Sequence, residues 1–345
     1  MTDRRRINGP PGGTRPPVFA SSLPTPEGQT SISFERPRRT RKAAELRKTF
    51  LKTGLVPSAS GSAYLELQPS AILPQSRSKS LIPPTSSLKL ICTVHGPRSL
   101  PRSAPFSPNL LLSTHVKFAP FASRRRRAWI RDASERDLGV HLETALRGAI
   151  LAERWPKSGL DVTITILEAE DDRWWGDVHS SGPLGGMEGW GLMNVLAGCI
   201  TAASAAIADA RIDCLDLVTG GVAGIVENTN GSDTKNTTTS QGHSLVLDPD
   251  PSEHRGIVSL CVVGYMPARD EITELWLKGE TPEVSPDGQN KVLGHEALID
   301  GAVEAARGAQ TILIDAVKES AERFAKQAGR DVSFASASTD VEMKI

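Results

Sequence analysis

Residues 196–208 read LAGCITAASAAIA, and this stretch decides how the chain can fold. Small side chains occupy nearly every side of the helix that the stretch would form, so neighbouring elements can approach it closely. The stretch is too short and too rich in small residues to predict a membrane span. We therefore expect a closely packed helix over about 193–210.

Two further helices are predicted on either side of this one. An i, i+3, i+4 stripe from Leu138 to Ile150 predicts an amphipathic helix that begins at a cap near Ser134. A second stripe predicts a long helix over about 291–328. Glycine recurs there every seven residues, and because each glycine weakens a helix, close backbone approach on one face is a plausible compensation.

The strands come in groups between these helices. Alternating or β-branched apolar runs end at turn residues such as Gly96-Pro97. Strands are expected over 61–67, 88–94, about 109–119, 161–167, 214–226, 256–266 and 271–278. The predicted order of elements is strands, helix, strand, helix, strands and helix. This order predicts an α+β layered fold.

The chain of 345 residues is longer than one small domain needs. Residues 1–43 combine Pro, Gly, Ser, Thr and Arg with few apolar residues, which predicts a disordered basic tail. The main domain is expected over 44–329, with a C-terminal tail over 330–345. Three stretches are rich in polar residues, Gly or Pro and are longer than a compact turn needs. They predict insertions at 68–86, 169–190 and 228–242.

The formal net charge of zero hides an asymmetry between the two parts of the chain. Residues 1–130 carry 22 Lys and Arg against 5 Asp and Glu, whereas residues 131–345 carry 18 against 35. This predicts a part that faces a polyanion beside an acidic part.

Four consecutive arginines stand out in the basic part. They follow an apolar run directly and are Arg124, Arg125, Arg126 and Arg127. A loop with four guanidinium groups can contact phosphates, so the run predicts contact with a nucleic acid. A nuclear-localisation patch or an ion-paired interface explains the run equally well.

The residue patterns of common metal and redox sites do not occur. No H-E-x-x-H, G-x-x-x-x-G-K-[ST] or G-x-S-x-G pattern is present, and no cysteine forms a C-x-x-C pair. We therefore expect no metal and no cofactor. Four buried free thiols in a reducing compartment explain the cysteines best. They are Cys92, Cys199, Cys214 and Cys261.

Two acid pairs are the remaining candidates for chemistry. Two carboxylates can hold Mg²⁺ or transfer protons only if the fold brings them together. Asp171-Asp172 falls in a predicted insertion and is expected to be solvated. Asp248 and Asp250 lie at a strand end, where a capping or turn role is expected.

Several motifs together resemble the RNase PH family, a fold of phosphorolytic 3′-to-5′ exoribonucleases that also builds the RNA exosome ring. The motifs are FLKTGLV at 50–56, SASGSAYL at 58–65, LICTVHGPR at 90–98, FAPFASRRRR at 118–127 and AIADA at 206–210. The resemblance covers about 46–329. It implies the RNase PH fold (ribosomal protein S5 domain 2-like), an α+β arrangement of sheets packed with helices.

The family's catalytic signature is not intact in this sequence. Active members carry a Gly-Gly-Thr-Arg-like element at the start of the second helix, where it holds phosphate. Alignment from the ADA at 208–210 places Met193, Asn194, Val195 and Leu196 at these positions. Active members also carry two aspartates six apart before an apolar strand, and the acid nearest to the strand at 260–263 is Glu253. The resemblance thus implies an inert chain with degenerate positions at Asn194, Val195 and Leu196.

The resemblance further implies a role in 3′-to-5′ RNA processing and degradation: rRNA processing, RNA surveillance and mRNA turnover. The expected partners are RNA, other RNase PH-like subunits in a hetero-hexameric ring, and S1/KH cap subunits, with no membrane. The residues expected to contact RNA are Arg124, Arg125, Arg126, Arg127, Arg98 and Lys52. The nucleus, nucleolus and cytoplasm are the expected locations. Two alternatives stay open: an active phosphorolytic exoribonuclease subunit, and a nucleic-acid-binding module independent of the exosome.

Overall fold

The computed structural model describes most of the predicted domain and leaves several predicted features outside. The described residues are 39–69, 87–123, 130, 132–170, 189–227, 243–254, 256–281 and 294–342, with the backbone alone for 327–342. Residues 1–38, nearly all of each predicted insertion and Asp171-Asp172 lie outside these ranges. The arginine run lies outside them as well, in each of its four members Arg124, Arg125, Arg126 and Arg127.

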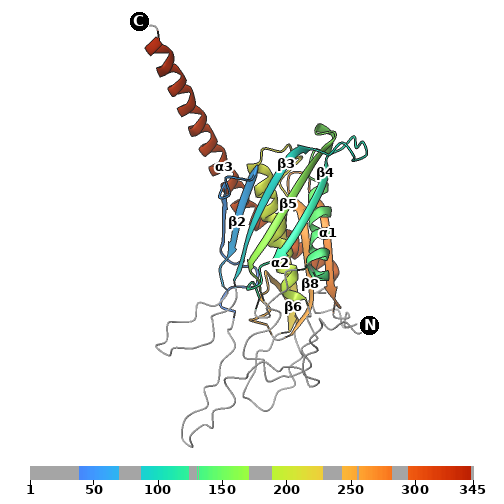
Figure 1. Ribbon diagram of the computed structural model, residues 1–345. Helices are drawn as coiled ribbons and strands as arrows, with labels where there is room; N and C mark the ends of the chain where they lie inside the picture. Colours follow the sequence, from blue (N-terminus) through green and yellow to red (C-terminus); the bar gives the residue numbers. More distant parts are fainter. Residues whose placement is uncertain are drawn as a thin grey trace, which may run out of the picture. The chain divides into compact units, whose positions relative to one another are not determined.

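Two sheets form the framework (Figure 1). The first has the order β1-β2-β3-β5-β4, in which β4 runs parallel to β5 and the other neighbours are antiparallel. Its strands are β1 (Thr49–Thr53), β2 (Gly61–Leu67), β3 (Leu88–Ser99), β4 (Leu111–Phe118) and β5 (Ser158–Glu168). The second sheet is antiparallel with the order β7-β6-β8-β9. Its strands are β6 (Thr219–Glu227), β7 (His243–Leu247), β8 (Ile257–Met266) and β9 (Glu271–Gly279).

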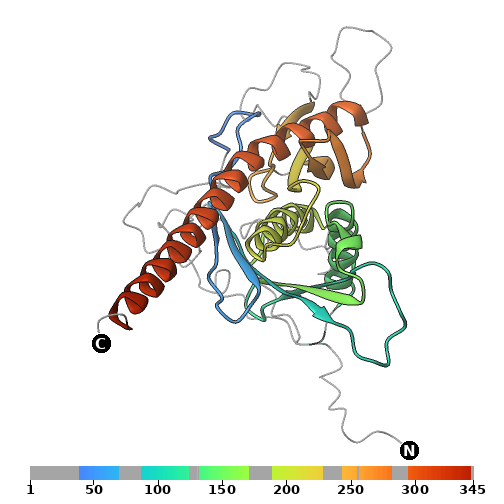
Figure 2. The same ribbon diagram turned by 90° about the horizontal axis from the view of Figure 1, so that it is seen from above.

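The helices divide into a central pair and an outer one. Two of them, α1 (Ala133–Arg147) and α2 (Trp190–Asp209), lie between the two sheets, and α3 (His295–Glu342) covers the opposite face of the second sheet (Figure 2). A short 3₁₀ helix, η1, spans Ala152–Arg154. The layers are therefore sheet, helices, sheet and helix, and the predicted α+β class is confirmed.

Helix α2 is the centre of the core. An 18-residue window of this 20-residue helix has a mean hydropathy of 1.7, so the helix is long and apolar enough to cross a membrane, and the expectation that this stretch is too short was wrong. However, 89% of that apolar window is buried inside the protein, which makes α2 a core helix here. The prediction of a closely packed helix is confirmed.

The glycines that allow close backbone approach are those of β6 rather than those of α3. A Cβ atom added to Gly220 would lie 2.2 Å from the Ala197 carbonyl oxygen of α2, and one added to Gly221 would lie 2.1 Å from the Ala302 carbonyl oxygen of α3. Two glycines in sequence thus let a helix backbone touch each face of one strand. Gly308 of α3, by contrast, makes room for the Leu46 side chain.

Several predicted boundaries were wrong for local reasons. Helix α1 begins at a capping box formed by Asp132 and Glu135, not at Ser134. Helix α3 continues past 328 to Glu342, since no proline interrupts it. Strand β6 starts at Thr219, five residues late, and β7 was not predicted. The four cysteines are free thiols as expected, and Cys214 is only partly buried.

We expect Gly221→Ala to lower the free energy of unfolding by about 3 kcal/mol, because the new methyl group overlaps a backbone oxygen that cannot rotate away. Gly139→Ala in α1 is the matched control. Its Cβ would meet Thr114 oxygen atoms at an ordinary 3.6 Å, so a gain of up to about 1 kcal/mol is expected. Urea unfolding of both variants measures the difference, and equal stability would contradict the close packing of β6 against α3.

Candidate functional site

The first turns of α2 are built from core residues. The helix starts at Gly189, which adopts a left-handed conformation and provides no side-chain cap. Met193, Val195 and Leu196 are fully buried, and Asn194 is 2% exposed. These four positions are those matched to the phosphate-binding element of the resembled family, and three of them carry no polar group. An anion therefore finds no side-chain donor from these three residues.

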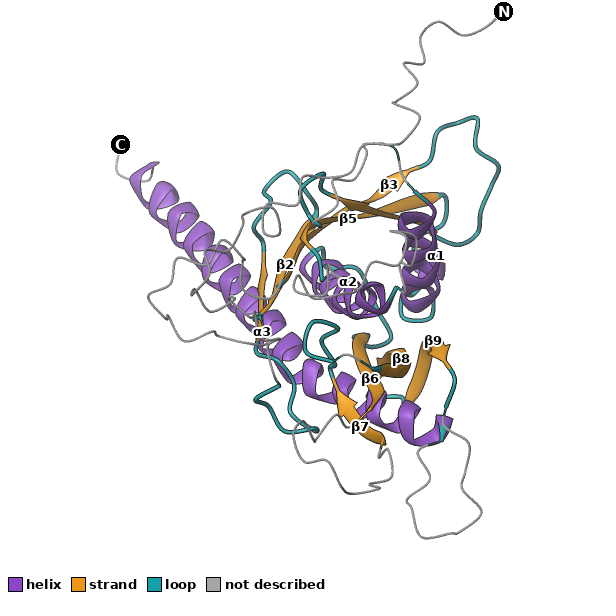
Figure 3. Ribbon diagram, turned by 90° about the horizontal axis from the view of Figure 1, so that it is seen from below, coloured by secondary structure: helices purple, strands orange, loops and turns teal. Residues whose placement is uncertain are grey.

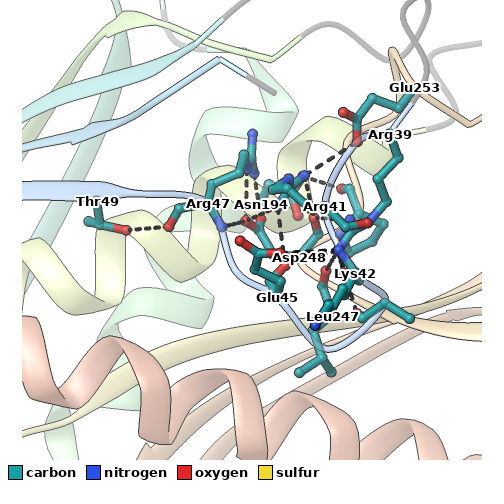
Figure 4. Close-up of polar contacts among 12 residues, drawn as sticks. Arg39, Arg41, Lys42, Glu45, Arg47, Thr49, Asn194, Leu247, Asp248 and Glu253 are labelled. Carbon is teal, nitrogen blue, oxygen red and sulfur yellow. Dashed lines mark hydrogen bonds and ion pairs between the residues drawn. The ribbon is translucent and has the colours of Figure 1, made fainter. Parts of the chain in front are cut away.

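A buried ion pair lies next to this helix start (Figure 4). Arg47 donates to the Asp248 carboxylate from its backbone N (2.9 Å), from Nε (2.8 Å) and from Nη2 (2.6 Å). Its Nη1 donates to Glu170. The side chains of Arg47 and Glu170 are at most 1% exposed. One guanidinium group thus bridges two carboxylates, one just after β5 of the first sheet and one just after β7 of the second.

Asn194 connects α2 to this pair. Its Nδ2 donates to Glu170 Oε2 at 2.6 Å and to the Pro249 carbonyl oxygen at 2.9 Å. Glu170 therefore receives a charged donor on one oxygen and an amide donor on the other. The residue at this degenerate position has a structural role, because it fastens the end of β5 and the chain after β7 to the core helix.

Arg39 and Arg41 add a second layer of contacts. Arg39 Nη2 donates to the carbonyl oxygens of Lys42 (2.8 Å) and Leu247 (3.0 Å). Arg41 lies 3.3 Å from carboxylate oxygens of both Asp248 and Glu253. Residues 39–43, the last part of the predicted basic tail, therefore make contacts with the chain after β7. The partners Leu247, Asp248 and Glu253 lie more than 200 residues further along the chain, so composition alone did not reveal these contacts.

The charges in this cluster shift one another's pKa. Burial favours neutral Asp248, but Arg47 and Arg41 outweigh it and hold the Asp248 pKa below its usual value. Burial also opposes the charge of Arg47, and Asp248 and Glu170 overcome this and raise its pKa. For Glu170, burial dominates and raises the pKa to about 7 in spite of Arg47. Burial, with help from Arg41, lowers the Arg39 pKa to about 10.

Asp248 and Asp250 have different roles. Asp250 forms a turn, as predicted: its Oδ1 accepts from Ser252 N at 2.8 Å and its carbonyl oxygen accepts from the Glu253 and His254 N–H groups. Asp248 also lies in a bend after β7, with a φ of 49°, but its carboxylate pairs with Arg47 in addition. The pairing of Asp248 with Arg47 was not predicted, because the two residues lie 201 positions apart and β7 was not predicted, although the alternation in HSLVL at 243–247 precedes Asp248 directly.

The cluster lacks the arrangement of a metal centre in the described part of the chain. Six residues after Asp248 stands His254, so the family's pattern of two aspartates six apart does not begin at Asp248. No group of three or more His, Cys, Asp or Glu among the described residues is placed to hold a metal ion. Between Asp248 and Glu170, moreover, the Arg47 guanidinium supplies the positive charge.

The two described residues that were predicted to bind RNA do not lie together. Lys52 is exposed on β1. In the register of the sheet it lies opposite Tyr64 of β2, and Tyr64 lies opposite Ile91 of β3. Arg98 lies seven residues further along β3, roughly 23 Å away at the usual rise of a strand. It is exposed and pairs with Asp161. The contact of Lys52 and of Arg98 with RNA stays a prediction.

The other four predicted RNA contacts lie outside the described residues. They are Arg124, Arg125, Arg126 and Arg127. The described chain stops at Ser123, five residues after the end of β4, and α1 begins ten residues later at Ala133. The arginine run thus falls in the connection between β4 and α1, and its contact with RNA stays a prediction.

Comparison with protein families gives a match over about half of the chain. The 3′ exoribonuclease family, domain 1, matches residues 45–213. Among curated proteins, the chain is 49% identical to Exosome complex component MTR3 of Chaetomium thermophilum, over 92% of this chain and 99% of that protein. It is 29% identical to Exosome complex component mtr3 of Schizosaccharomyces pombe, over 81% of this chain and 85% of that protein.

Solved structures include rice (Oryza sativa) Rrp46, which superposes with a TM-score of 0.54 at 14% sequence identity. The match covers 81% of this chain and 98% of the rice chain. At this identity the likeness concerns the fold alone. It places the two sheets and their helices in an architecture already seen by crystallography.

We expect Asp248→Asn to lower the free energy of unfolding at pH 7 by about 3 kcal/mol, because Arg47 then keeps its buried charge with one carboxylate fewer. The Asp248 pKa is depressed in the folded chain, so its contribution is present above the unfolded pKa of about 4 and is lost as the pH falls below it. The difference between wild type and variant should therefore shrink from pH 5 to pH 2. Urea unfolding across this range measures it.

The control is Asp213→Asn, which removes an exposed ion pair with Arg154. A loss below about 0.5 kcal/mol is expected there. If the two variants are equally stable at pH 7, the buried pair does not stabilise the fold as described.

Proposed function

The chain belongs to the 3′ exoribonuclease (RNase PH) family, and from this membership we propose that it is a non-catalytic subunit of the RNA exosome core ring. Its relatives from Chaetomium thermophilum, Schizosaccharomyces pombe and Homo sapiens are named as exosome complex components, and it aligns with 84% or more of the length of each. The motifs FLKTGLV and FAPFA predict a relation to the mRNA-transport-regulator subunit in a fungal-type version. That prediction is confirmed.

The absence of catalysis is supported above all by the Arg47 bridge. Metal-assisted attack by phosphate needs carboxylates that are free to bind a cation. Asp248 and Glu170 instead share the guanidinium group of Arg47, which is buried with them. Phosphate binding needs accessible donors, and Val195 and Leu196 offer buried apolar side chains at the matching positions. The start of α2 therefore lacks side-chain donors for phosphate at Val195 and Leu196, and the two buried carboxylates beside it are already paired.

The proposed role of the subunit is to complete the ring and to hold RNA during 3′-to-5′ processing and degradation by the assembly. Its proposed neighbours are other RNase PH-like subunits and S1/KH cap subunits. The proposed RNA contacts are supported by their charge in a run of four: Arg124, Arg125, Arg126 and Arg127. We place the protein in the nucleus, nucleolus and cytoplasm, where the RNA classes named above are processed.

The reaction itself tests the proposal. The chain is assembled with RNase PH-like subunits of its own organism and incubated with phosphate and an RNA that has a free 3′ end. We expect no nucleoside diphosphate release that depends on this chain, because its carboxylates are neutralised and its phosphate donors are missing. An active RNase PH enzyme serves as the positive control.

Release that disappears with Asp248→Asn, while the ring stays assembled, would assign the activity to this chain and contradict the proposal. Leu196→Arg is unsuitable as a gain-of-function test, because it would place a charge in the core. If the chain does not co-purify with any ring subunit, the exosome-independent module is the better description.

RNA binding by the ring tests the arginine run. We expect replacement of all four arginines at 124–127 by alanine to weaken RNA binding and to flatten its dependence on salt, because fewer counterions are released per RNA bound. The measurement is the slope of log K against log salt concentration. Substitution of Arg154, an exposed arginine already paired with Asp213, is the control. An unchanged slope in the quadruple variant would show that the arginines contact protein instead.

A further inference from the structure

The close packing around α2 is interrupted at one place, by a cavity of about 200 Å³ next to the buried Arg47. Its walls come from α2, α3, β6 and the strand pair β1–β2. Figure 3 shows α2 between the first sheet and β6, and α3 packs on β6 and reaches β1. A cavity of about 150 Å³ with apolar walls binds benzene. The cavity beside α2 therefore has room for a six-membered ring with one further group.

Most of the cavity wall is apolar and deeply buried. The side chains of Leu51, Leu65 and Val222 line it and are at most 7% exposed. Ala197 of α2 and Ala305 of α3 line it as well and are 8% and 3% exposed. Walls of this kind give a water molecule few hydrogen-bond partners, so they favour an apolar occupant.

One polar atom at the cavity has no hydrogen-bond partner among the described residues, and it is Asn194 Oδ1. The orientation of the amide is fixed, because the Pro249 carbonyl oxygen, which can only accept, lies 2.9 Å from Nδ2. Asn194 shares one face of α2 with Ala197, Gly198 and Thr201, which also line the cavity. Since Asn194 is 2% exposed, its oxygen needs a donor that bulk water does not supply.

The other polar side chains at the cavity are already paired. Thr201 Oγ1 donates to the Ala197 carbonyl oxygen at 3.1 Å and accepts from Gly220 N at 3.0 Å. Asp248 and Arg47 neutralise each other. A charged ligand would lose its hydration without gaining a counter-charge here, whereas a neutral molecule with one donor meets one acceptor.

The half-buried residues of the wall lie together on one side. They are Leu46 and Thr49 at the start of β1, and Gly308 and Ile312 on α3. Leu46 rests on Gly308, where an added Cβ would lie 2.4 Å from its Cδ1 atom. A leucine side chain changes rotamer readily, so a small molecule can reach the cavity between β1 and α3 while the sheets stay packed.

We propose that this cavity binds a small neutral molecule with an apolar ring and a single hydroxyl or N–H donor, of about the size of phenol, and that the donor bonds to Asn194 Oδ1. The inference goes beyond the proposed function, because the site involves neither RNA nor a neighbouring subunit. Since α2, α3 and the β1–β2 pair all contribute walls, an occupant holds these elements together and stabilises the folded chain.

Calorimetric titration of the full chain with phenol, and with toluene as a probe of similar shape that has no donor, locates the site. We expect phenol to bind and to raise the Tm. Ala305→Leu fills the cavity from α3, so binding of both probes should weaken at least about tenfold. Glu304→Leu, at the neighbouring exposed position of α3, is the matched control, and less than about a twofold change is expected. Circular dichroism establishes that both variants keep their fold.

Asn194→Leu tests the hydrogen bond, because it removes the acceptor and keeps most of the side-chain volume. We expect the affinity for phenol to fall about tenfold relative to that for toluene. A crystal structure of the wild type with phenol makes the same test without a variant, with the hydroxyl oxygen expected at about 2.8 Å from Asn194 Oδ1.

Three results would overturn the inference: phenol does not bind the wild type, Ala305→Leu binds it as well as the control does, or the bound phenol lies away from Asn194. An unchanged ratio of phenol to toluene affinity in folded Asn194→Leu would overturn it too. None of these results bears on the proposed role in the exosome, which the reaction and co-purification experiments test separately.

Discussion

The burial of α2 on all sides is the constraint on which the rest of this structure depends. The helix fills the space between two sheets, and β6 is made of glycine where the backbones of α2 and α3 approach it. Close packing of this kind leaves no room for side chains that reach outward. The first turns of α2 therefore became part of the core, with Leu196 among the largest fully buried side chains.

The charged cluster beside α2 follows from the same constraint. A carboxylate brought into a closed interior must be paired or lose its charge. Arg47 supplies the pairing for both Asp248 and Glu170, and Asn194 completes the hydrogen bonds of Glu170. One arginine thus ties the chain before β1 to the ends of β5 and β7. The carboxylates of Asp248 and Glu170 thus help to join the two sheets through Arg47.

Strand β9 shows how the same packing against the central helices leaves one face of an edge strand exposed. The faces of β9 are unequal: Trp276 and Glu274 are fixed against α1, while Leu275 and Leu277 on the other face stay exposed. The acidic charge of residues 131–345 lies in the same part of the chain as this edge.

Local patterns in the sequence determined the element types, the α+β class, the family and the loss of the phosphate-binding element. These depend on neighbours a few residues apart, so periodicity and motifs carry them. Tertiary structure alone decided that Asp248 pairs with Arg47, that residues 39–43 are ordered, and that Lys52 and Arg98 stay apart. Each of these depends on residues far apart in sequence, some of them about 200 positions. Residues so far apart in sequence become buried and paired only when the two sheets pack around α2 and bring them together.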